Sequence, residues 1–290
     1  MSLQASGTAS ERAPEAGRLL LEARDVHVWY ERGLPAERHA LRGVTLGILA
    51  GDRVGVMGGS GAGKSTLLHV FARLQPPGTG EVWADDPHGR LPSLVFQFPE
   101  RQLFAETVRE DVGYGLREGG AARAEVDPRV REALEDVGLP PDDFAARPPF
   151  HLSAGEKRRV ALAAALAQRR GIVLLDEPTL GLDLDGIRRL ISILERMHAR
   201  GVAYWVASHD ADFVGATCTQ TVVLDEGRVV FQGPAEQLWR DAERAAAWGV
   251  RLPRESALAD RLRSCGVKGL PPRPTPQQIA GSLLALWHRR

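Results

Sequence analysis

A glycine-rich octapeptide is the part of the sequence best equipped for chemistry. It has the spacing G-x-x-x-x-G-K-[ST] and consists of Gly58, Gly59, Ser60, Gly61, Ala62, Gly63, Lys64 and Ser65, with Thr66 next. An apolar strand pattern precedes it and an apolar helix pattern follows it, which is the context that this spacing requires. Its glycines let backbone N–H groups point at phosphate oxygens, and the helix N-terminus adds partial positive charge. The segment predicts a nucleoside-triphosphate site in which Lys64 reaches the β- and γ-phosphates and the Ser65 hydroxyl binds Mg²⁺.

Two adjacent acids, Asp176 and Glu177, follow the apolar run 172–175. If this run is a strand, Asp176 lies at its carboxyl end, where it can hold the coordination shell of Mg²⁺. Glu177 can then polarise the water that attacks the γ-phosphate. The alternative is two solvated acids that merely end a strand, but the phosphate loop favours the catalytic interpretation. The pair therefore predicts hydrolysis of the nucleotide rather than binding alone.

A third segment precedes another apolar helix pattern and consists of Leu152, Ser153, Ala154, Gly155 and Glu156. A serine cap with Glu156 three residues later is a capping box, which explains the segment locally. The Ser153 hydroxyl and the N–H groups that follow it would equally form an anion-binding helix start. The functional interpretation depends on the position of the segment, just ahead of the acid-bearing strand.

Strand and helix patterns alternate along most of the chain. Strand patterns occur at residues 19–28, 41–49, 53–57, 91–97, 172–175, 202–207, 222–224 and 229–231. Helix patterns occur at residues 64–74, 107–117, 127–137, 154–168 and 184–199. This alternation predicts an α/β domain with a mostly parallel sheet and an antiparallel portion near its start.

We expect three parts of the chain. Residues 1–17 are small and polar, without the apolar stretch of a secretory signal, and predict a disordered lead. Residues 18–248 form the α/β domain. In residues 249–290 prolines flank two short helix patterns, which predicts a small helical appendage.

The composition is that of a soluble globular chain. Of 290 residues 43% are hydrophobic, and 37 basic residues balance 37 acidic ones. A zero net charge gives no general attraction to nucleic acid, and no apolar run reaches the roughly 18–20 residues that span a bilayer. The two cysteines, Cys218 and Cys265, cannot form a disulfide framework. We therefore expect a cytoplasmic protein without a nucleic-acid partner.

The order of these motifs resembles the ATP-binding subunits of ATP-binding-cassette (ABC) proteins, over residues 20–238 approximately. The segment at 152–156 is the most family-specific part, because it is similar to the LSGGQ signature. The resemblance implies a P-loop NTPase fold of the ABC type: a RecA-like parallel core, an antiparallel β subdomain and a helical subdomain that carries the signature. It also implies a head-to-tail dimer in which each ATP lies between one phosphate loop and the signature of the other subunit.

The resemblance implies roles for single residues. Tyr30 matches the aromatic that stacks on adenine, Gln97 the residue that senses Mg²⁺ and water, and His209 the switch that contacts the γ-phosphate. Each has a simpler alternative: Tyr30 as an ordinary strand aromatic, Gln97 as a polar strand end, and His209 as part of a helix cap with Asp210. The intact order of the motifs favours the family roles.

The remaining family roles fall on residues that act across the dimer. The signature would contact the partner's ATP through Ser153, Ala154, Gly155 and Glu156. A second loop, formed by Leu182 and Asp183, would communicate across the dimer. Ala154 stands where glycine is usual and Glu156 where glutamine is usual. The alanine adds a Cβ where ATP approaches closely, which can slow or weaken closure of the dimer. The glutamate adds a negative charge near a nucleotide phosphate, which the family often tolerates.

Residues 95–104 resemble one group within the family, the ATPases of energy-coupling-factor and cobalt/nickel importers. The pattern is Pro99, Glu100, any residue, Gln102, Leu103 and Phe104. This resemblance implies ATP and Mg²⁺ as cofactors, and a peripheral location on the cytoplasmic face of the membrane. Its implied partners are a second ABC ATPase (identical or homologous), a transmembrane coupling subunit and a substrate-binding membrane component. The cargo would be a vitamin or a transition-metal ion, and the appendage at 249–290 would help hold two ATPases together.

Two alternatives stay open at this point. The chain could be the ATPase of another class of ABC transporter. It could also be a soluble ABC ATPase without a transport role, in assembly or DNA maintenance, although it lacks the long coiled coil usual in chromosome ATPases.

Overall fold

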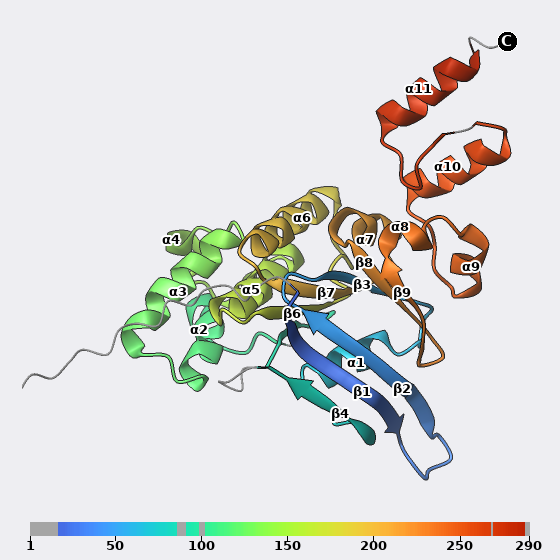
Figure 1. Cartoon of the computed structure of the whole chain (residues 1–290). Coiled ribbons are helices and arrows are strands. Elements are labelled where there is room, and N and C mark those ends of the chain that lie inside the picture. Colours follow the sequence, from blue (N-terminus) through green and yellow to red (C-terminus); the bar gives the residue numbers. More distant parts are fainter. Residues whose placement is uncertain (1–16, 86–90, 99–101, 268, 288–290) are drawn as a thin grey trace, which may run out of the picture.

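The computed structural model describes residues 17–85, 91–98, 102–267 and 269–287 (Figure 1). The expected lead, apart from Gly17, and Pro99, Glu100 and Arg101 of the importer-like pattern lie outside the described residues.

A six-stranded sheet forms the centre of the molecule, in the order β5-β6-β7-β3-β8-β9. Its strands are β3 (Arg53–Met57), β5 (Ser93–Val95), β6 (Ile172–Asp176), β7 (Ala203–Ala207), β8 (Gln220–Asp225) and β9 (Arg228–Pro234). All neighbours pair parallel except β8 and β9, which confirms the mostly parallel sheet. Every residue of β6 and β7 is buried, as expected for strands covered on both faces. The carboxyl ends of β3, β6 and β7 therefore meet at one edge.

A second, antiparallel sheet has the order β2-β1-β4 and comprises β1 (Leu19–Tyr30), β2 (Arg38–Leu49) and β4 (Thr79–Ala84). Helix α1 (Lys64–Phe71) belongs to the core shared by the two sheets: Leu67 and Phe71 join one buried cluster with Val28 of β1 and Trp205 of β7. The rings of Phe71 and Trp205 pack edge to face with centroids 5.2 Å apart. This packing fixes the start of α1, and with it the phosphate loop, against the end of β3.

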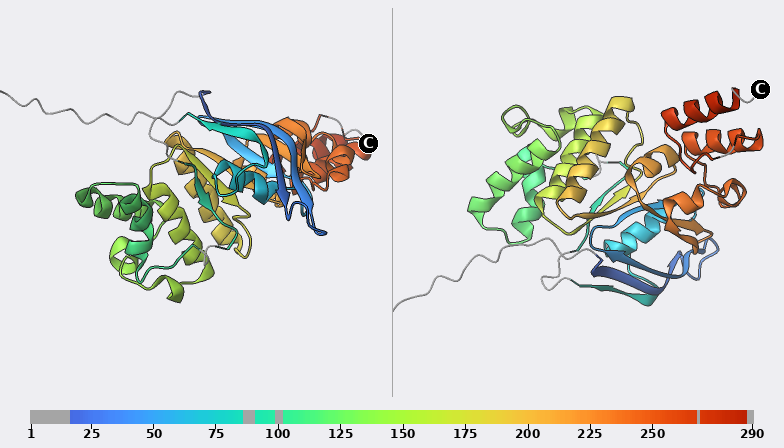
Figure 2. Two further views of the ribbon diagram at one scale, coloured as in Figure 1. Left: turned by 90° about the horizontal axis from the view of Figure 1, so that it is seen from below. Right: turned by 45° about the horizontal axis from the view of Figure 1, so that its top comes forward.

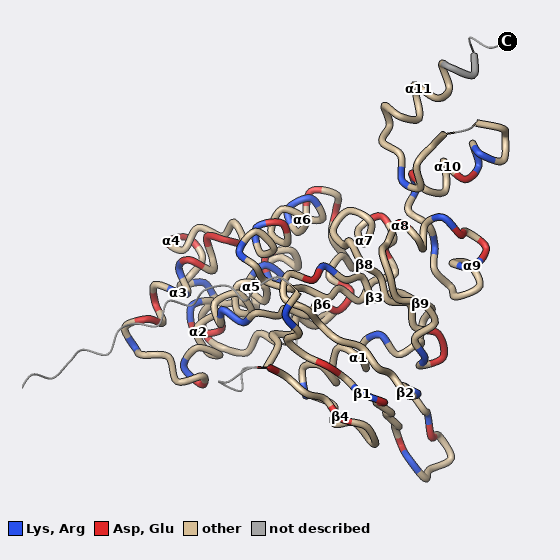
Figure 3. Tube along the Cα trace, in the orientation of Figure 1, with Lys and Arg blue, Asp and Glu red and all other residues tan. Residues whose placement is uncertain are grey.

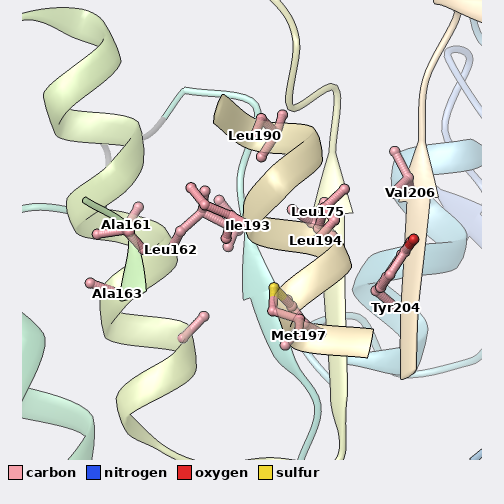
Figure 4. Close-up of a cluster of buried hydrophobic side chains, with 14 of the residues drawn as sticks. Ala161, Leu162, Ala163, Leu175, Leu190, Ile193, Leu194, Met197, Tyr204 and Val206 are labelled. Atoms are coloured by element: carbon pink, nitrogen blue, oxygen red, sulfur yellow. The ribbon is translucent and has the colours of Figure 1, made fainter. Parts of the chain in front are cut away.

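The helical subdomain contains α2 (Val108–Glu118), α3 (Arg123–Asp136), α4 (Pro141–Phe144), the 3₁₀ turn Pro149–His151 and α5 (Ala154–Ala167). Helix α6 (Leu184–Ala199) lies beside α5 and β6 (Figure 4). Leu162 of α5, Ile193 of α6 and Leu175 of β6 belong to the same buried cluster. Helix α5 also contacts β5 directly, where the Ser93 hydroxyl donates to the carbonyl oxygen of Ala165 at 3.3 Å. The signature helix α5 is thus packed both against the sheet and against α6.

The C-terminal part begins with α7 (Ala211–Thr217), α8 (Ala235–Leu238) and α9 (Ala242–Ala247). The main core continues to Val250 and Leu252. Helices α10 (Arg254–Ser264) and α11 (Pro276–Trp287) lie at the end of the molecule opposite the helical subdomain (Figure 1, Figure 2). They have a small core of their own around Ala259 and Leu270. Among the described residues, no helix is long and apolar enough to cross a membrane.

Candidate nucleotide site

The phosphate loop joins β3 to α1 in a conformation that needs glycine at two places. Gly58 has φ 134° and Gly63 has φ 107°. A Cβ on Gly58 would lie 2.1 Å from the carbonyl oxygen of Leu224, and one on Gly63 would lie 2.7 Å from that of Ala40. Neither position accepts a side chain without displacing backbone of a neighbouring segment.

Lys64 closes the phosphate loop upon itself. Its Nζ donates to the carbonyl oxygens of Gly58 and Gly59, both at 3.0 Å. Burial lowers the pKa of this ammonium, against the opposing effect of the Glu177 and Asp176 carboxylates. The cation is therefore held in a partly desolvated site, where it attracts an anion more strongly than it would in bulk water.

Asp176 ends β6 with its side chain turned inward, and the residue is 5% exposed. Burial raises the pKa of its carboxyl, and a hydrogen bond from Ser65 partly offsets this effect. Its Oδ1 is buried and has no hydrogen-bond partner among the described residues. A carboxylate with an unused oxygen beside a serine hydroxyl is a donor set that suits a hard divalent cation.

The described residues contain no cluster of three or more His, Cys, Asp or Glu side chains that could hold a metal ion. Mg²⁺ in nucleotide sites needs no such cluster, because one or two side chains, water and the phosphates complete its shell. The pair Ser65 and Asp176 therefore fits the ion that the sequence motif implies.

Glu177 follows Asp176 in a left-handed backbone conformation, φ 44°, which is uncommon outside glycine and is often found at functional sites. Its N–H donates to the carbonyl oxygen of Ala207 at 2.8 Å, which fixes the turn beside β7. Its Oε2 lies 2.8 Å from Nδ1 of His209 and accepts a hydrogen bond from the Ser208 hydroxyl at 3.4 Å. The carboxylate is held from one side, in a position to act as a base toward water.

Tyr30 lies beside the start of α1, whereas Gln97 lies beside the turn that follows Glu177. The phenol oxygen of Tyr30 is 3.1 Å from the hydroxyl of Thr66, and its ring is partly exposed, as a base-stacking aromatic requires. Gln97 follows β5 and lines a pocket of about 210 Å³ together with Leu180 and Leu182. The structure thus brings Gln97 next to the turn that follows Glu177.

The signature starts α5 with the capping box that its sequence predicts. Glu156 accepts a hydrogen bond from the N–H of Ser153 at 2.8 Å, and Ser153 accepts one from the N–H of Glu156 at 3.3 Å. Hydrogen bonds with Ser153 lower the pKa of Glu156. The carboxylate that replaces the usual glutamine therefore turns back onto its own helix cap.

The signature lies apart from the phosphate loop. Ser153, Ala154 and Gly155 line a pocket of about 390 Å³ with Leu182 and Asp183, and its lining includes no residue from 58–66. Asp183 caps α6 by accepting from the N–H of Gly186 at 2.7 Å. The signature and the phosphate loop therefore do not line this pocket together.

Arg158 is a residue of this region to which the sequence analysis assigned no role. Its guanidinium is buried and donates to the carbonyl oxygens of Gln97, Pro178 and Leu180. In a chain with only three lysines and abundant arginine, one more arginine gave no signal. Its position five residues after Ser153 on an apolar helix face is the feature that marks it for burial.

A phosphate loop after β3 and paired carboxylates after β6 of a mostly parallel sheet define a nucleoside triphosphatase of the P-loop class. Residues 41–180 match the ABC transporter family. The chain belongs to the ATP-binding subunits of that family, as the resemblance of its motifs predicted. It is an ATP-binding, ATP-hydrolysing transporter subunit.

Curated relatives share a more specific name. The chain is 38% identical to the energy-coupling factor transporter ATP-binding protein EcfA of Methanothermobacter thermautotrophicus, over 85% of this chain and 81% of that protein. It is 40% identical to EcfA2 of Symbiobacterium thermophilum, over 82% of this chain and 86% of that protein.

Two solved structures agree with the ABC family and with the energy-coupling-factor group. The chain is similar to CbiO1 of Clostridium perfringens, part of the transporter complex CbiONQ, with a TM-score of 0.67, 31% identity, and coverage of 84% and 99% of the two chains. It is also similar to the dimeric ATP-binding cassette MJ0796 bound to ADP and Pi, with a TM-score of 0.66, 29% identity, and coverage of 74% and 99%. These findings confirm the predicted fold class and the energy-coupling-factor resemblance.

Proposed function

We propose that the chain drives an energy-coupling-factor importer as one half of a head-to-tail ATPase dimer. The observation that carries this proposal is the separation of the phosphate loop from Ser153 within one chain, although each half is intact. A second cassette, identical or homologous, would bring its signature to this phosphate loop. The dimeric relative MJ0796 and the names of the EcfA relatives support this arrangement.

Within the closed dimer, each residue has a task that its geometry supports. Lys64 and the N–H groups of the phosphate loop bind the β- and γ-phosphates. Ser65 and Asp176, with Gln97, would hold Mg²⁺, which neutralises phosphate charge and fixes the orientation of ATP. Glu177 takes a proton from the attacking water, while His209 holds the carboxylate and contacts the γ-phosphate.

We further propose that a transmembrane coupling subunit docks beside Gln97, at the cytoplasmic face of the membrane. An exposed aromatic pair supports this site: Phe104 and Tyr114 meet edge to face at 4.8 Å, and Phe98 is exposed as well. Exposed aromatic side chains that gather on one face are typical of protein interfaces. A substrate-binding membrane component, rather than this chain, would hold the cargo, a vitamin or a transition-metal ion.

Purification of the tagged chain from mildly solubilised native membranes, followed by mass spectrometry, tests the proposal. We expect a small polytopic membrane subunit, with or without a second cassette. The variant Phe104→Asp should lose the membrane subunit but keep ATP hydrolysis in isolation. Recovery of soluble partners alone, or of DNA, would overturn the transport role and leave the ATPase chemistry standing.

A further inference from the structure

The guanidinium of Arg158 joins three segments that are distant in sequence. The residue lies in the second turn of α5 and is 6% exposed. Its Nη1 donates to the carbonyl oxygens of Pro178 at 2.7 Å and Leu180 at 2.6 Å, and its Nη2 donates to that of Gln97 at 3.1 Å. Bonds from a cationic donor are stronger than those between neutral groups, especially where water is excluded. Arg158 therefore holds these segments in a fixed relation.

The joined segments serve different ATP molecules. Helix α5 starts at Ser153, which in the proposed dimer faces the ATP of the partner subunit. In the same proposed dimer, Gln97 and the turn 178–180, directly after Glu177 in the chain, would border the ATP of this chain. Arg158 thus connects the signature, which would contact the partner's ATP, with the segments that would border the ATP of its own chain.

We infer that Arg158 is a positioning residue that couples the two ATP sites of the cassette dimer. The inference rests on the dimer of the proposed function and goes beyond it. When ATP of the partner engages Ser153 and shifts the start of α5, the guanidinium transmits this shift to the Gln97 carbonyl and to the turn after Glu177. Because coupling between sites is reciprocal, ATP bound to this chain aligns Ser153 for the partner.

The chemistry of the side chain suits this role. A guanidinium is a rigid planar fork with five donors, so it can reach carbonyl oxygens of two loops at once. Lysine carries the same charge on one compact head and cannot span them. Arg196 of α6 provides a contrast, because its Nη2 donates to the carbonyl oxygen of Asp136 at 2.6 Å, at the end of α3.

Three variants test the inference: Arg158→Gln, Arg158→Lys and the control Arg196→Gln, which also removes a guanidinium that donates to a backbone carbonyl. Each is made in the wild-type chain for steady-state ATPase assays, and with Glu177→Gln for sedimentation with ATP. Circular dichroism and the melting temperature establish folding. Binding of a fluorescent ATP analogue at concentrations where the chain is monomeric gives the affinity of the isolated site.

For both Arg158 variants we expect a kcat at least about tenfold lower and a Hill coefficient reduced toward 1, within the usual range of coupling between sites. ATP-driven dimerisation should weaken, while the analogue affinity of the monomer stays within about twofold of wild type, as for sites coupled only through the dimer. Arg196→Gln should match the wild-type chain in all these readouts. Arg158→Lys keeps the buried charge, so it remains informative if Arg158→Gln does not fold.

Three results would overturn the inference: wild-type kcat and Hill coefficient in Arg158→Lys, an equal loss in Arg196→Gln, or a loss of monomer affinity as large as the loss of turnover. Failure of the parent Glu177→Gln chain to dimerise with ATP is a separate result. It would refute the dimer of the proposed function itself, before any substitution at Arg158 is considered.

Discussion

Two adjacent carboxylates at the end of β6 have different surroundings. Asp176 points into the core beside Ser65, with one oxygen unused, whereas Glu177 turns out toward His209. The left-handed backbone of Glu177 separates them, because it turns the chain sharply after the strand. One acid is therefore suited to a cation and its neighbour to a water molecule.

Glu177→Gln should abolish turnover and keep nucleotide binding. The amide preserves the shape of the side chain but cannot take a proton from water, and loss of a general base costs about 10²–10⁴-fold in rate. Phosphate release measures the first property and equilibrium binding of ATP the second. Lys64→Ala provides the contrast, since it should weaken ATP binding itself. Near-normal turnover in Glu177→Gln would remove Glu177 from its proposed role.

Asp176→Asn should stabilise the metal-free protein at pH 7, by on the order of 1 kcal/mol, because it removes a buried charge with an unsatisfied oxygen. Burial raises the pKa of Asp176 in the folded chain, so the folded state takes up a proton before the unfolded state does. Wild-type stability therefore recovers as the pH falls from 7 toward the ordinary carboxyl pKa of about 4, and the difference shrinks.

Urea denaturation with a chelator at several pH values measures this difference. Added Mg²⁺ and ATP should stabilise the wild-type chain more than Asp176→Asn. A variant that is less stable than wild type in chelator at pH 7, or a difference that grows as the pH falls, would contradict the assignment of Asp176 as a strained, charged ligand.

At the scale of the elements, two helices start with the same capping motif. Thr107 caps α2 with Glu110, and Ser153 caps α5 with Glu156, each in a complete capping box. The local energetics of the two caps are thus comparable, but only the second belongs to the signature. A comparison of the two caps therefore distinguishes the contribution of a cap to stability from a role of the cap residue in the dimer.

Ser153→Ala and Thr107→Ala should each lower the free energy of unfolding by about 1 kcal/mol. Only Ser153→Ala should also reduce ATPase activity and ATP-driven dimerisation, because in the proposed dimer its hydroxyl would face the partner's ATP. Urea titrations and phosphate release measure the two effects. An equal loss of activity in both variants would show that the effect comes from helix stability, not from the signature.

The sequence predicted those elements whose apolar pattern is unbroken. Helix α6 has the predicted limits 184–199, and β6 differs by one residue. It did not predict β4, because Thr79–Ala84 is largely exposed and its pairing with β1 is a long-range contact. Helix α3 starts at Arg123, before the predicted 127, and includes Pro128. This proline is the sixth residue of the helix, past the first turn, so its missing N–H removes one i→i−4 hydrogen bond.

The site was predictable for a similar reason. Lys64, Asp176 and Glu177 belong to motifs whose spacing alone indicates phosphate chemistry. The contact between Glu177 and His209 depends on the pairing of β6 with β7. The family resemblance implied this fold, but the spacing of the residues in the sequence does not predict the contact. The three carbonyl contacts of Arg158 depend on loop conformations, and no side-chain pattern encodes them.

At the scale of the whole molecule, acidic and basic residues are interspersed along the described chain (Figure 3). This mixture gives no broad field of one sign, in keeping with the zero net charge. Recognition of a partner then depends on local shape and apolar contacts. The exposed aromatics beside Gln97 and the appendage formed by α10 and α11 are two such surfaces, at different ends of the molecule.

The C-terminal boundary has a structural marker. The backbone of Gly249 lies against the phosphate loop, so closely that a Cβ there would be 3.2 Å from Cα of Gly59. Val250 and Leu252 still belong to the main core, and the separate small core begins at Ala259. We therefore propose that the appendage starts after Leu252, four residues later than the sequence alone suggested.

A chain cut after residue 252 should keep its ATP site and lose part of its dimer contact. The cut removes α10 and α11, which meet the body through Arg254 on Asp212 and Arg273 on the Gly215 carbonyl. We expect an unchanged affinity for ATP and a nucleotide-free dimer weakened by at least about tenfold, or ~1.4 kcal/mol. Sedimentation at several concentrations measures the dimer.

A second cut, after residue 248, is the control that separates the two functions of this region. It also removes Gly249, and thereby the backbone that supports Gly59, so it should weaken ATP binding as well as the dimer. If both truncated chains bind ATP like the full chain, the contact at Gly249 does not support the phosphate loop. If the chain cut after residue 252 dimerises as strongly as the full chain, α10 and α11 are not the dimerisation element. Their exposed leucines, Leu258, Leu283 and Leu284, would then have to be explained by contact with another protein.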